Sequence, residues 1–238
     1  IVLRYNDIVG SHAHRYNDPV ETAENGAVDG GFNRDADVYG NVMAFGEDDG
    51  IELDGGQCNV RMFNNRIEQV LCGISTAPNK KGPSYIFNNL VWNLGDSNGR
   101  VGAAVKNGGG ILHSIGRQFF FNNTFISSGY GCLHAVGFGD SAPASKRGMF
   151  HATTRNNIFM ITTVPGSPPG NGNRGPSIGD THRTETNSFD YDMVANDTLP
   201  DGKGVMVAAE GSEPHGVFAS PSFVNAVNGV FALANADP

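Results

Sequence analysis

The chain has 238 residues, of which 39% are hydrophobic, and its formal net charge is −8 at pH 7. Nucleic acids are bound through a basic surface, so this acidic balance excludes DNA and RNA as expected partners. No stretch of about 18 uninterrupted apolar residues occurs, and we therefore expect no membrane span. The length is compatible with one β-rich domain over residues 1–238.

The beginning of the chain already contains a pattern that recurs further on. Residues 1–8 form an alternating apolar stretch with an asparagine at Asn6. Copies of this unit carry an asparagine at Asn41, Asn65, Asn89, Asn123 and Asn157. Self-similarity at a spacing of about 20–50 residues is typical of solenoids, in which each repeat is one coil. Because the chain starts inside the pattern, we expect it to be an excerpt of a longer protein.

The next repeats are short, with 24 residues from Asn41 to Asn65 and again from Asn65 to Asn89. A second short strand precedes each asparagine-bearing strand, beginning near Gly50 in one coil and near Gly73 in the next. Several short strands per coil, without a 3.6-residue period, predict coils of β-strand in which every second side chain points inside. Asparagine fits the bends because it tolerates left-handed geometry, and stacked asparagines can hydrogen-bond from coil to coil.

The repeats lengthen to 34 residues between Asn89 and Asn157. About ten residues of each longer coil must therefore leave the regular cross-section as loops. Residues 161–180 are rich in glycine, proline, asparagine and serine, which predicts a long loop. Together the repeats predict an all-β fold, a single-stranded parallel β-helix of about seven coils.

Several motifs of the chain are similar to those of a known superfamily. They are Asp48-Asp49-Gly50-Ile51-Glu52, Asn59-Val60-Arg61, Gly73-Ile74-Ser75, Phe119-Phe120-Phe121-Asn122-Asn123 and Pro221-Ser222-Phe223-Val224-Asn225. In these segments the chain resembles the right-handed parallel β-helix proteins of the pectate-lyase-like superfamily. The resemblance implies a right-handed β-helix. It leaves the activity open, because this fold hosts lyases, hydrolases, epimerases and phage tailspikes.

An acidic stretch provides the first candidate site. Five carboxylates fall within eight residues, at Glu47, Asp48, Asp49, Glu52 and Asp54. If residue 28 is the counterpart of Ile51 in the preceding coil, Asp29 lies below Glu52. Carboxylate oxygens from adjacent coils suit a hard cation such as Ca²⁺, which takes about 6–8 oxygen ligands. We therefore predict a calcium site made of Asp48, Asp49, Glu52, Asp54 and Asp29, with an acidic solvated face as the alternative.

A proposed column of outward side chains provides the second candidate site. Alignment of the coils on their asparagines places Glu52, Ser75, Lys106 and His134 above one another, with Asp29 beneath them. Some calcium-dependent lyases of the superfamily hold Ca²⁺ with aspartates and use a lysine as base, and the resemblance implies that role for Lys106. Here Glu52 stands where the family has aspartate. From the residues alone, Lys106 or His134 is the expected catalytic base, because either accepts a proton when neutral.

Arginines are the expected partners of a substrate carboxylate, which guanidinium binds through two parallel hydrogen bonds. Arg66 follows an asparagine bend and Arg100 lies in an expanded loop, so we assign these two to the catalytic site. Arg61, Arg117 and Ser75 are the predicted substrate-binding residues.

The function that these observations favour is a polysaccharide lyase, acting by β-elimination on an acidic, uronate-containing polysaccharide. We expect it to be a monomer, secreted, exposed at the cell surface or periplasmic, and dependent on Ca²⁺. Two alternatives stay open. One is a glycoside hydrolase that uses a pair of carboxylates from the acidic stretch. The other is a non-catalytic glycan-binding or structural β-helix, such as part of an adhesin or a tailspike.

Overall fold

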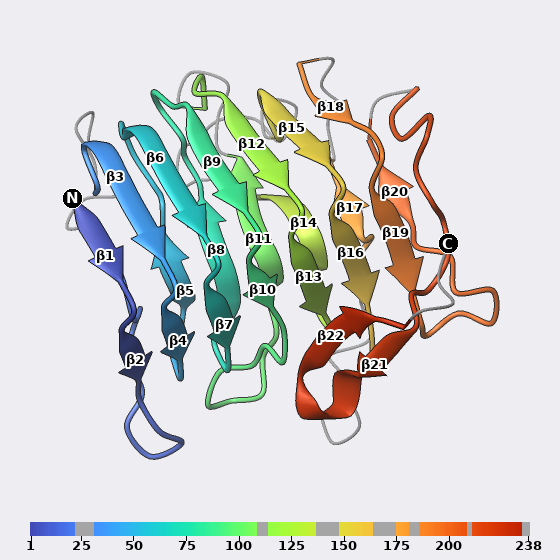
Figure 1. Cartoon of the computed structure of the whole chain (residues 1–238), viewed down its shortest axis with the longest axis horizontal. Coiled ribbons are helices and arrows are strands. Elements are labelled where there is room, and N and C mark those ends of the chain that lie inside the picture. The colour runs from blue at the N-terminus through green and yellow to red at the C-terminus, as the bar shows by residue number, and fades with distance from the viewer. Residues whose placement is uncertain are drawn as a thin grey trace.

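The computed structural model describes residues 1–21, 31–108, 114–136, 148–163, 175–180, 186–208 and 211–234. Three long sheets of parallel strands surround one core, and the coils stack in order from the N-terminus to the C-terminus (Figure 1). The predicted all-β parallel β-helix is therefore confirmed. Two of the sheets contain seven strands each, one from each successive coil, which confirms the predicted number of coils.

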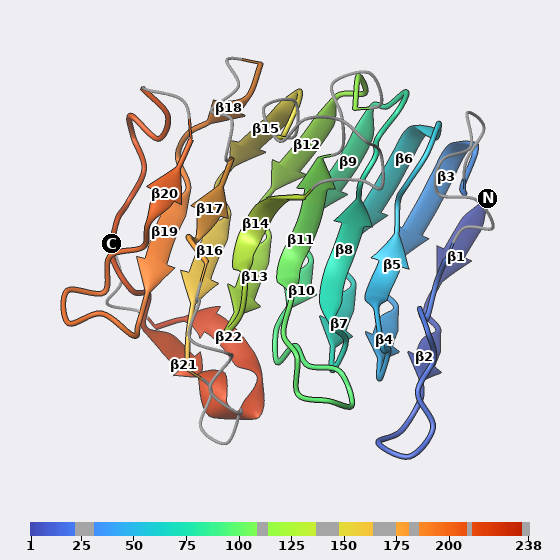
Figure 2. The ribbon, with the colours of Figure 1, turned by 180° about the vertical axis from the view of Figure 1, so that it is seen from behind.

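The coils build three sheets, which we call sheets 1, 2 and 3; each coil contributes a strand to sheets 1 and 2, and the second to seventh coils also contribute a strand to sheet 3. Sheet 1 contains β1 (Val2–Arg4), β3 (Arg34–Tyr39), β6 (Cys58–Phe63), β9 (Ser84–Phe87), β12 (Gln118–Phe121), β15 (Ala152–Arg155) and β18 (Ser188–Phe189). Sheet 2 contains β2 (Asp7–Val9), β4 (Val42–Ala44), β7 (Arg66–Glu68), β10 (Leu90–Val91), β13 (Thr124–Ser127), β16 (Ile158–Ile161) and β19 (Met193–Asn196). Sheet 3 contains β5 (Asp49–Glu52), β8 (Cys72–Thr76), β11 (Ala103–Gly108), β14 (Gly131–Val136), β17 (Ile178–Gly179) and β20 (Met206–Val207). Figure 2 shows sheet 3 towards the viewer.

The core runs along the inside of the coils. In sheet 3, Ile51, Ile74, Val105 and Leu133 lie opposite one another in parallel register, and all four are fully buried. Strand alternation explains this, because the same position of each coil points inside when the strands pair copy to copy. The next residue along each strand then points to the outer face, where the candidate site lies.

Two neighbouring residues share the bend between sheets 1 and 2. The first, Asn64 in the third coil, has a left-handed φ of 54°, which asparagine tolerates. The second, Asn65, is buried, and its Nδ2 donates to Asn89 Oδ1 at 3.0 Å. The ladder continues coil by coil to Asn157, whose Nδ2 donates to Asp192 Oδ1 at 2.8 Å. These hydrogen bonds hold the bends in register and confirm the predicted ladder.

The register of the first coil differs from the prediction. Val20 lies opposite Ile51 in a parallel bridge, and Glu52 N donates to Val20 O at 3.0 Å. The residue below Glu52 is therefore the one after Val20, which is Glu21. Asp29 does not take this position, and it lies outside the described residues. The prediction was wrong because it applied the 24-residue step of the later coils. The first coil is longer, with 35 residues between Asn6 and the next ladder position.

The expected loop over residues 161–180 is shorter than predicted. Ile161 ends β16, and β17 (Ile178–Gly179) pairs with both β14 and β20. Ile178 is fully buried and joins the core, which explains why this part returns to the solenoid. Residues 164–174 lie outside the described part of the chain.

The C-terminal segment folds back onto sheet 2 as an antiparallel hairpin of β21 (Phe223–Asn225), the short helix η2 (Ala226–Asn228) and β22 (Val230–Leu233) (Figure 1). The ring of Phe231 contacts Trp92 edge to face, with 5.2 Å between ring centroids. Phe223 and Phe231 pack on a second small core that includes Ile126 and Met160. No helix in the described ranges is long and apolar enough to cross a membrane.

Candidate functional site on the outer face of sheet 3

The predicted column on sheet 3 exists. Glu52 lies opposite Ser75, Ser75 opposite Lys106, and Lys106 opposite His134 in continuous parallel register. The column continues to Gly179 in the next coil. Adjacent strands of a sheet are about 4.8 Å apart, so these side chains follow one another closely along the solenoid. The strand periodicity of the sequence was sufficient to place them.

Lys106 crosses this face to reach an aspartate two coils away. Its Nζ lies 2.5 Å from Asp49 Oδ2, and the side chains are 24% and 1% exposed. Burial disfavours the ammonium, but the Asp49 carboxylate outweighs it and raises the pKa of Lys106. Burial also disfavours the charged form of Asp49 and raises the pKa of this carboxyl group to about 8, although the nearby Lys106 ammonium acts in the opposite direction. Lys106 is therefore protonated and paired in this structure, which is not the state of a general base.

Asp54 is buried beside the column and is satisfied by its neighbours. Ser75 Oγ donates to both of its carboxylate oxygens, at 2.8 and 2.9 Å, and Ala77 N donates to Oδ1 at 2.8 Å. Burial raises the pKa of Asp54 to about 6 in spite of these bonds. Ser75 is fully buried. The geometry thus makes Ser75 a partner of Asp54 and leaves it no surface for a substrate.

Three carboxylates form a compact acidic group at the lower end of the column. One carboxylate oxygen each of Asp18, Asp48 and Asp49 lies within 4.8 Å of the other two. Asp49 Oδ1 is buried and has no hydrogen-bond partner in the described part of the chain. Burial raises the pKa of Asp18 to about 7, and the carboxyl groups of Glu21, Glu52 and Asp48 add to this effect.

The acidic group differs from the predicted calcium ligands. Asp48 and Asp49 belong to it, whereas Glu52 and Asp54 do not, and Asp29 is outside the described ranges. Asp18 was missed by the sequence reasoning, although a signal was present. Asp18 precedes Asp49 by 31 residues, and its carboxylate accepts from Asp49 N at 2.5 Å. Alignment of the first coil with its true, longer step would have placed Asp18 beside Asp49.

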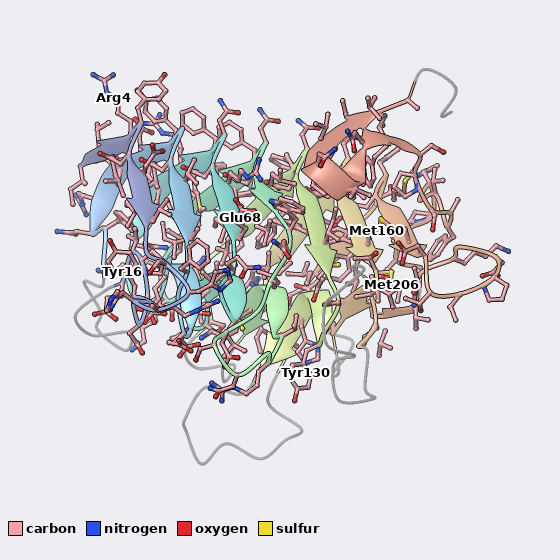
Figure 3. The ribbon with its side chains drawn as sticks, turned by 90° about the horizontal axis from the view of Figure 1, so that it is seen from below. Arg4, Tyr16, Glu68, Tyr130, Met160 and Met206 are labelled. Carbon is pink, nitrogen blue, oxygen red and sulfur yellow. The ribbon has the colours of Figure 1, made fainter. Side chains whose placement is uncertain are left out.

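His134 is the last side chain of the column, one coil before Gly179, and is half-buried. Burial lowers its pKa, so the imidazole is neutral at pH 7. Its Nδ1 is buried without a hydrogen-bond partner among the residues described. A Cβ at Gly179 would lie 2.9 Å from this atom, so the ring depends on glycine at that position. The exposed ring of Tyr130 lies 6.4 Å away between centroids, and Figure 3 shows Tyr130 projecting from the side of the molecule opposite Arg4.

The predicted arginines are distributed over three sides of the molecule. Only Arg100 lies near the acidic group: its ion pair with Asp96 raises the pKa of Arg100, and the Glu47 and Asp48 carboxylates contribute. Its side chain is largely exposed. Arg66 belongs to sheet 2, where it pairs with Glu68 at 3.0 Å and stacks on Trp92. Arg61 is on sheet 1 and Arg117 directly precedes β12, so neither belongs to sheet 3.

Compared with family models, with curated proteins and with solved structures, the chain matches none. The class that the fold and the site define is therefore a parallel β-helix protein with an ionisable site on the outer face of sheet 3. That site contains a compact acidic group, a buried lysine–aspartate ion pair and a neutral histidine.

Proposed function

We propose that the protein is a secreted polysaccharide lyase of the pectate-lyase-like type, acting by β-elimination on a uronate polysaccharide. The observation that carries the proposal is the neutral His134 in line with the Lys106 ammonium on an outer sheet face. β-Elimination needs a base for the weakly acidic proton beside a carboxylate. It also needs positive charge to stabilise the enolate-like transition state.

The geometry favours His134 over Lys106 as the base. His134 is uncharged at neutral pH and accepts the proton from the carbon beside the carboxylate. The electron pair of that C–H bond then forms a double bond, and the glycosidic oxygen on the next carbon leaves with its bonding pair and takes a proton from solvent. Lys106, one rung below, supplies positive charge to the same face. We assign to the exposed guanidinium of Arg100 the binding of a second carboxylate of the polymer.

Asp18, Asp48 and Asp49 fit a hard cation such as Ca²⁺, because their oxygens converge and Asp49 Oδ1 is buried without a partner. When bound, the ion would neutralise a substrate carboxylate. The raised pKa of Asp18, about 7, couples binding to pH, since the cation competes with a proton. Calcium affinity should therefore increase between about pH 6 and 8.

The test is a panel of uronate polysaccharides followed by the ultraviolet absorbance of the unsaturated product, with and without a chelator. A lyase produces this absorbance, a hydrolase gives new reducing ends without it, and a binding protein gives neither. His134→Ala should lower the rate by about 10²–10⁴-fold. His14→Ala, at an exposed position outside the site, is the matched control. Unchanged activity of His134→Ala would overturn the assignment of the base.

A further inference from the structure

The outer face of sheet 1 carries a stack of aromatic rings that belongs to no site described above. Tyr39, Phe63 and Phe87 occupy the same position in three successive coils. Their rings are nearly parallel, with centroids 4.7 Å apart for the first pair and 4.8 Å apart for the second. A ring that is stacked on both faces offers only its edge to a ligand.

This stack stops above Phe87. Phe121 lies opposite Phe87 in the next coil, but its ring leans towards Phe119, at 5.9 Å between centroids and an angle of 35°. Phe119 in turn stacks on Tyr85 at 5.2 Å. No ring stacking joins Phe87 to Phe121 within the described residues, and Phe87 is only half-buried. A hollow of about 510 Å³ opens here, lined by Asn59, Arg61, Tyr85, Phe87, Phe121 and Asn122.

Polar groups surround this aromatic floor. Arg61 is held by Asp37, with Nε–Oδ1 at 2.6 Å and Nη2–Oδ2 at 3.0 Å. This pairing uses two of the five N–H donors of the guanidinium, and the described residues provide no partner for Nη1. Asn59 and Asn122 are both exposed at the margins of the hollow. The hollow thus combines a half-buried aromatic ring, a pre-oriented guanidinium and two amides.

We propose that this hollow on sheet 1 binds an acidic saccharide and anchors the polymer on which the sheet 3 site acts. A sugar presents an apolar C–H face, which packs on an aromatic ring, and hydroxyl groups, which bond to amides. A uronate carboxylate matches the remaining donors of Arg61. The lining residues come from three coils about 4.8 Å apart, so the hollow extends about 10 Å along the solenoid, enough for two sugar units.

The choice of ligand rests on the proposed function, but the site is separate from the catalytic one. Arg61 and Phe87 are in strands of sheet 1, whereas Lys106 and His134 are in strands of sheet 3. Binding at the hollow therefore requires no residue of the column, and catalysis requires no residue of the hollow.

The test uses trisaccharides of galacturonate, of mannuronate and from hyaluronan, titrated into the full chain and followed by NMR. Tyr85 lines the hollow, so shifts of its ring resonances report binding there and distinguish it from binding at sheet 3. Phe87→Ala and Arg61→Gln should each weaken the binding of at least one trisaccharide by about tenfold or more. Phe63→Ala removes an equivalent stacked ring that does not line the hollow, and it should change binding by less than about twofold.

Three outcomes would overturn the proposal: no shift of Tyr85 with any of the three saccharides, unchanged affinity in both hollow variants, or an oligomer that dissociates in Phe87→Ala. Weaker binding in Arg61→Gln would not reflect a folding defect, because Arg61 is exposed. The two proposals fail separately. If saccharides bind at the hollow but no unsaturated product forms, the proposed lyase activity is refuted and the proposed binding site stands. If product forms but the hollow variants bind saccharides as the wild type does, only the proposed binding site is refuted.

Discussion

Replacement of Lys106 by methionine tests the electrostatic account of the site most directly. Lys106 is the only hydrogen-bond partner that the described residues provide for the Asp49 carboxylate. Methionine keeps the aliphatic length but leaves Asp49, 1% exposed, as a buried carboxyl group without a counter-charge. Breaking a buried pair in this way costs about 3–5 kcal/mol. Because Lys106 is a quarter exposed and the pKa of Asp49 is about 8, we expect about 3 kcal/mol well above that pKa, at about pH 10, without added calcium.

The sign of the pH dependence follows from Asp49. Its folded pKa is already raised by burial, and removal of Lys106 raises it further. A carboxyl group with a raised folded pKa loses its stabilising contribution as the pH increases through that pKa. The folded pKa of Asp49 is about 8 in the wild type. Lys106→Met should therefore be close to the wild type at pH 5, where Asp49 is protonated in both, and clearly less stable at about pH 10, where only the wild type carries the paired carboxylate. The assay is urea unfolding at both pH values.

The double variant Lys106→Met with Asp49→Asn is the matched control, since it removes both charges. It should recover most of the loss, because two neutral groups carry no uncompensated charge. Calcium at about 100 times its dissociation constant should add about 2.7 kcal/mol to the wild type, and less to the variants that lack Asp49. Lys106→Met within about 1 kcal/mol of the wild type at about pH 10 would refute the reasoning.

Three further predictions concern the ladder, the histidine and the last coil. Asn89→Ala removes five side-chain hydrogen bonds inside the solenoid and should cost about 3–5 kcal/mol in urea unfolding. Gly179→Ala puts a Cβ 2.9 Å from both His134 Nδ1 and Pro176 Cγ, so we expect at least about tenfold lower activity and a loss of about 1–3 kcal/mol in stability. Burial and the Asp192 carboxylate raise the pKa of Glu213 to about 8, so stability should fall as the pH rises through 8, and Glu213→Gln should flatten that fall in thermal unfolding.

Each of these predictions has its own control. Asn6→Ala acts at the exposed end of the ladder and should cost clearly less than the central variant, and equal costs would contradict a cooperative ladder. Gly95→Ala meets nothing within 4 Å and should leave the activity unchanged. A pH profile of the same slope with and without Glu213 would show that this carboxyl group does not hold the last coil.

The sequence by itself determined the solenoid, the number of its coils and the order of residues along each face. Strand pairing repeats the same translation in every coil, so a regular spacing fixes the register of Glu52, Ser75, Lys106 and His134 without tertiary information. The one register that failed belongs to the first coil, where Val20 pairs with Ile51 after a longer step.

Only the tertiary structure decided what the side chains of that column contact. A lysine has four rotatable bonds, and no periodicity says that Lys106 reaches across two coils to Asp49. Loop conformation likewise brings Arg100 towards Asp48 and keeps Arg61 on another sheet. The hollow beside Phe87 depends on the tilt of a single ring, which packing sets. Backbone register is a local, repeated property, whereas the site depends on side-chain directions that the whole assembly of coils selects.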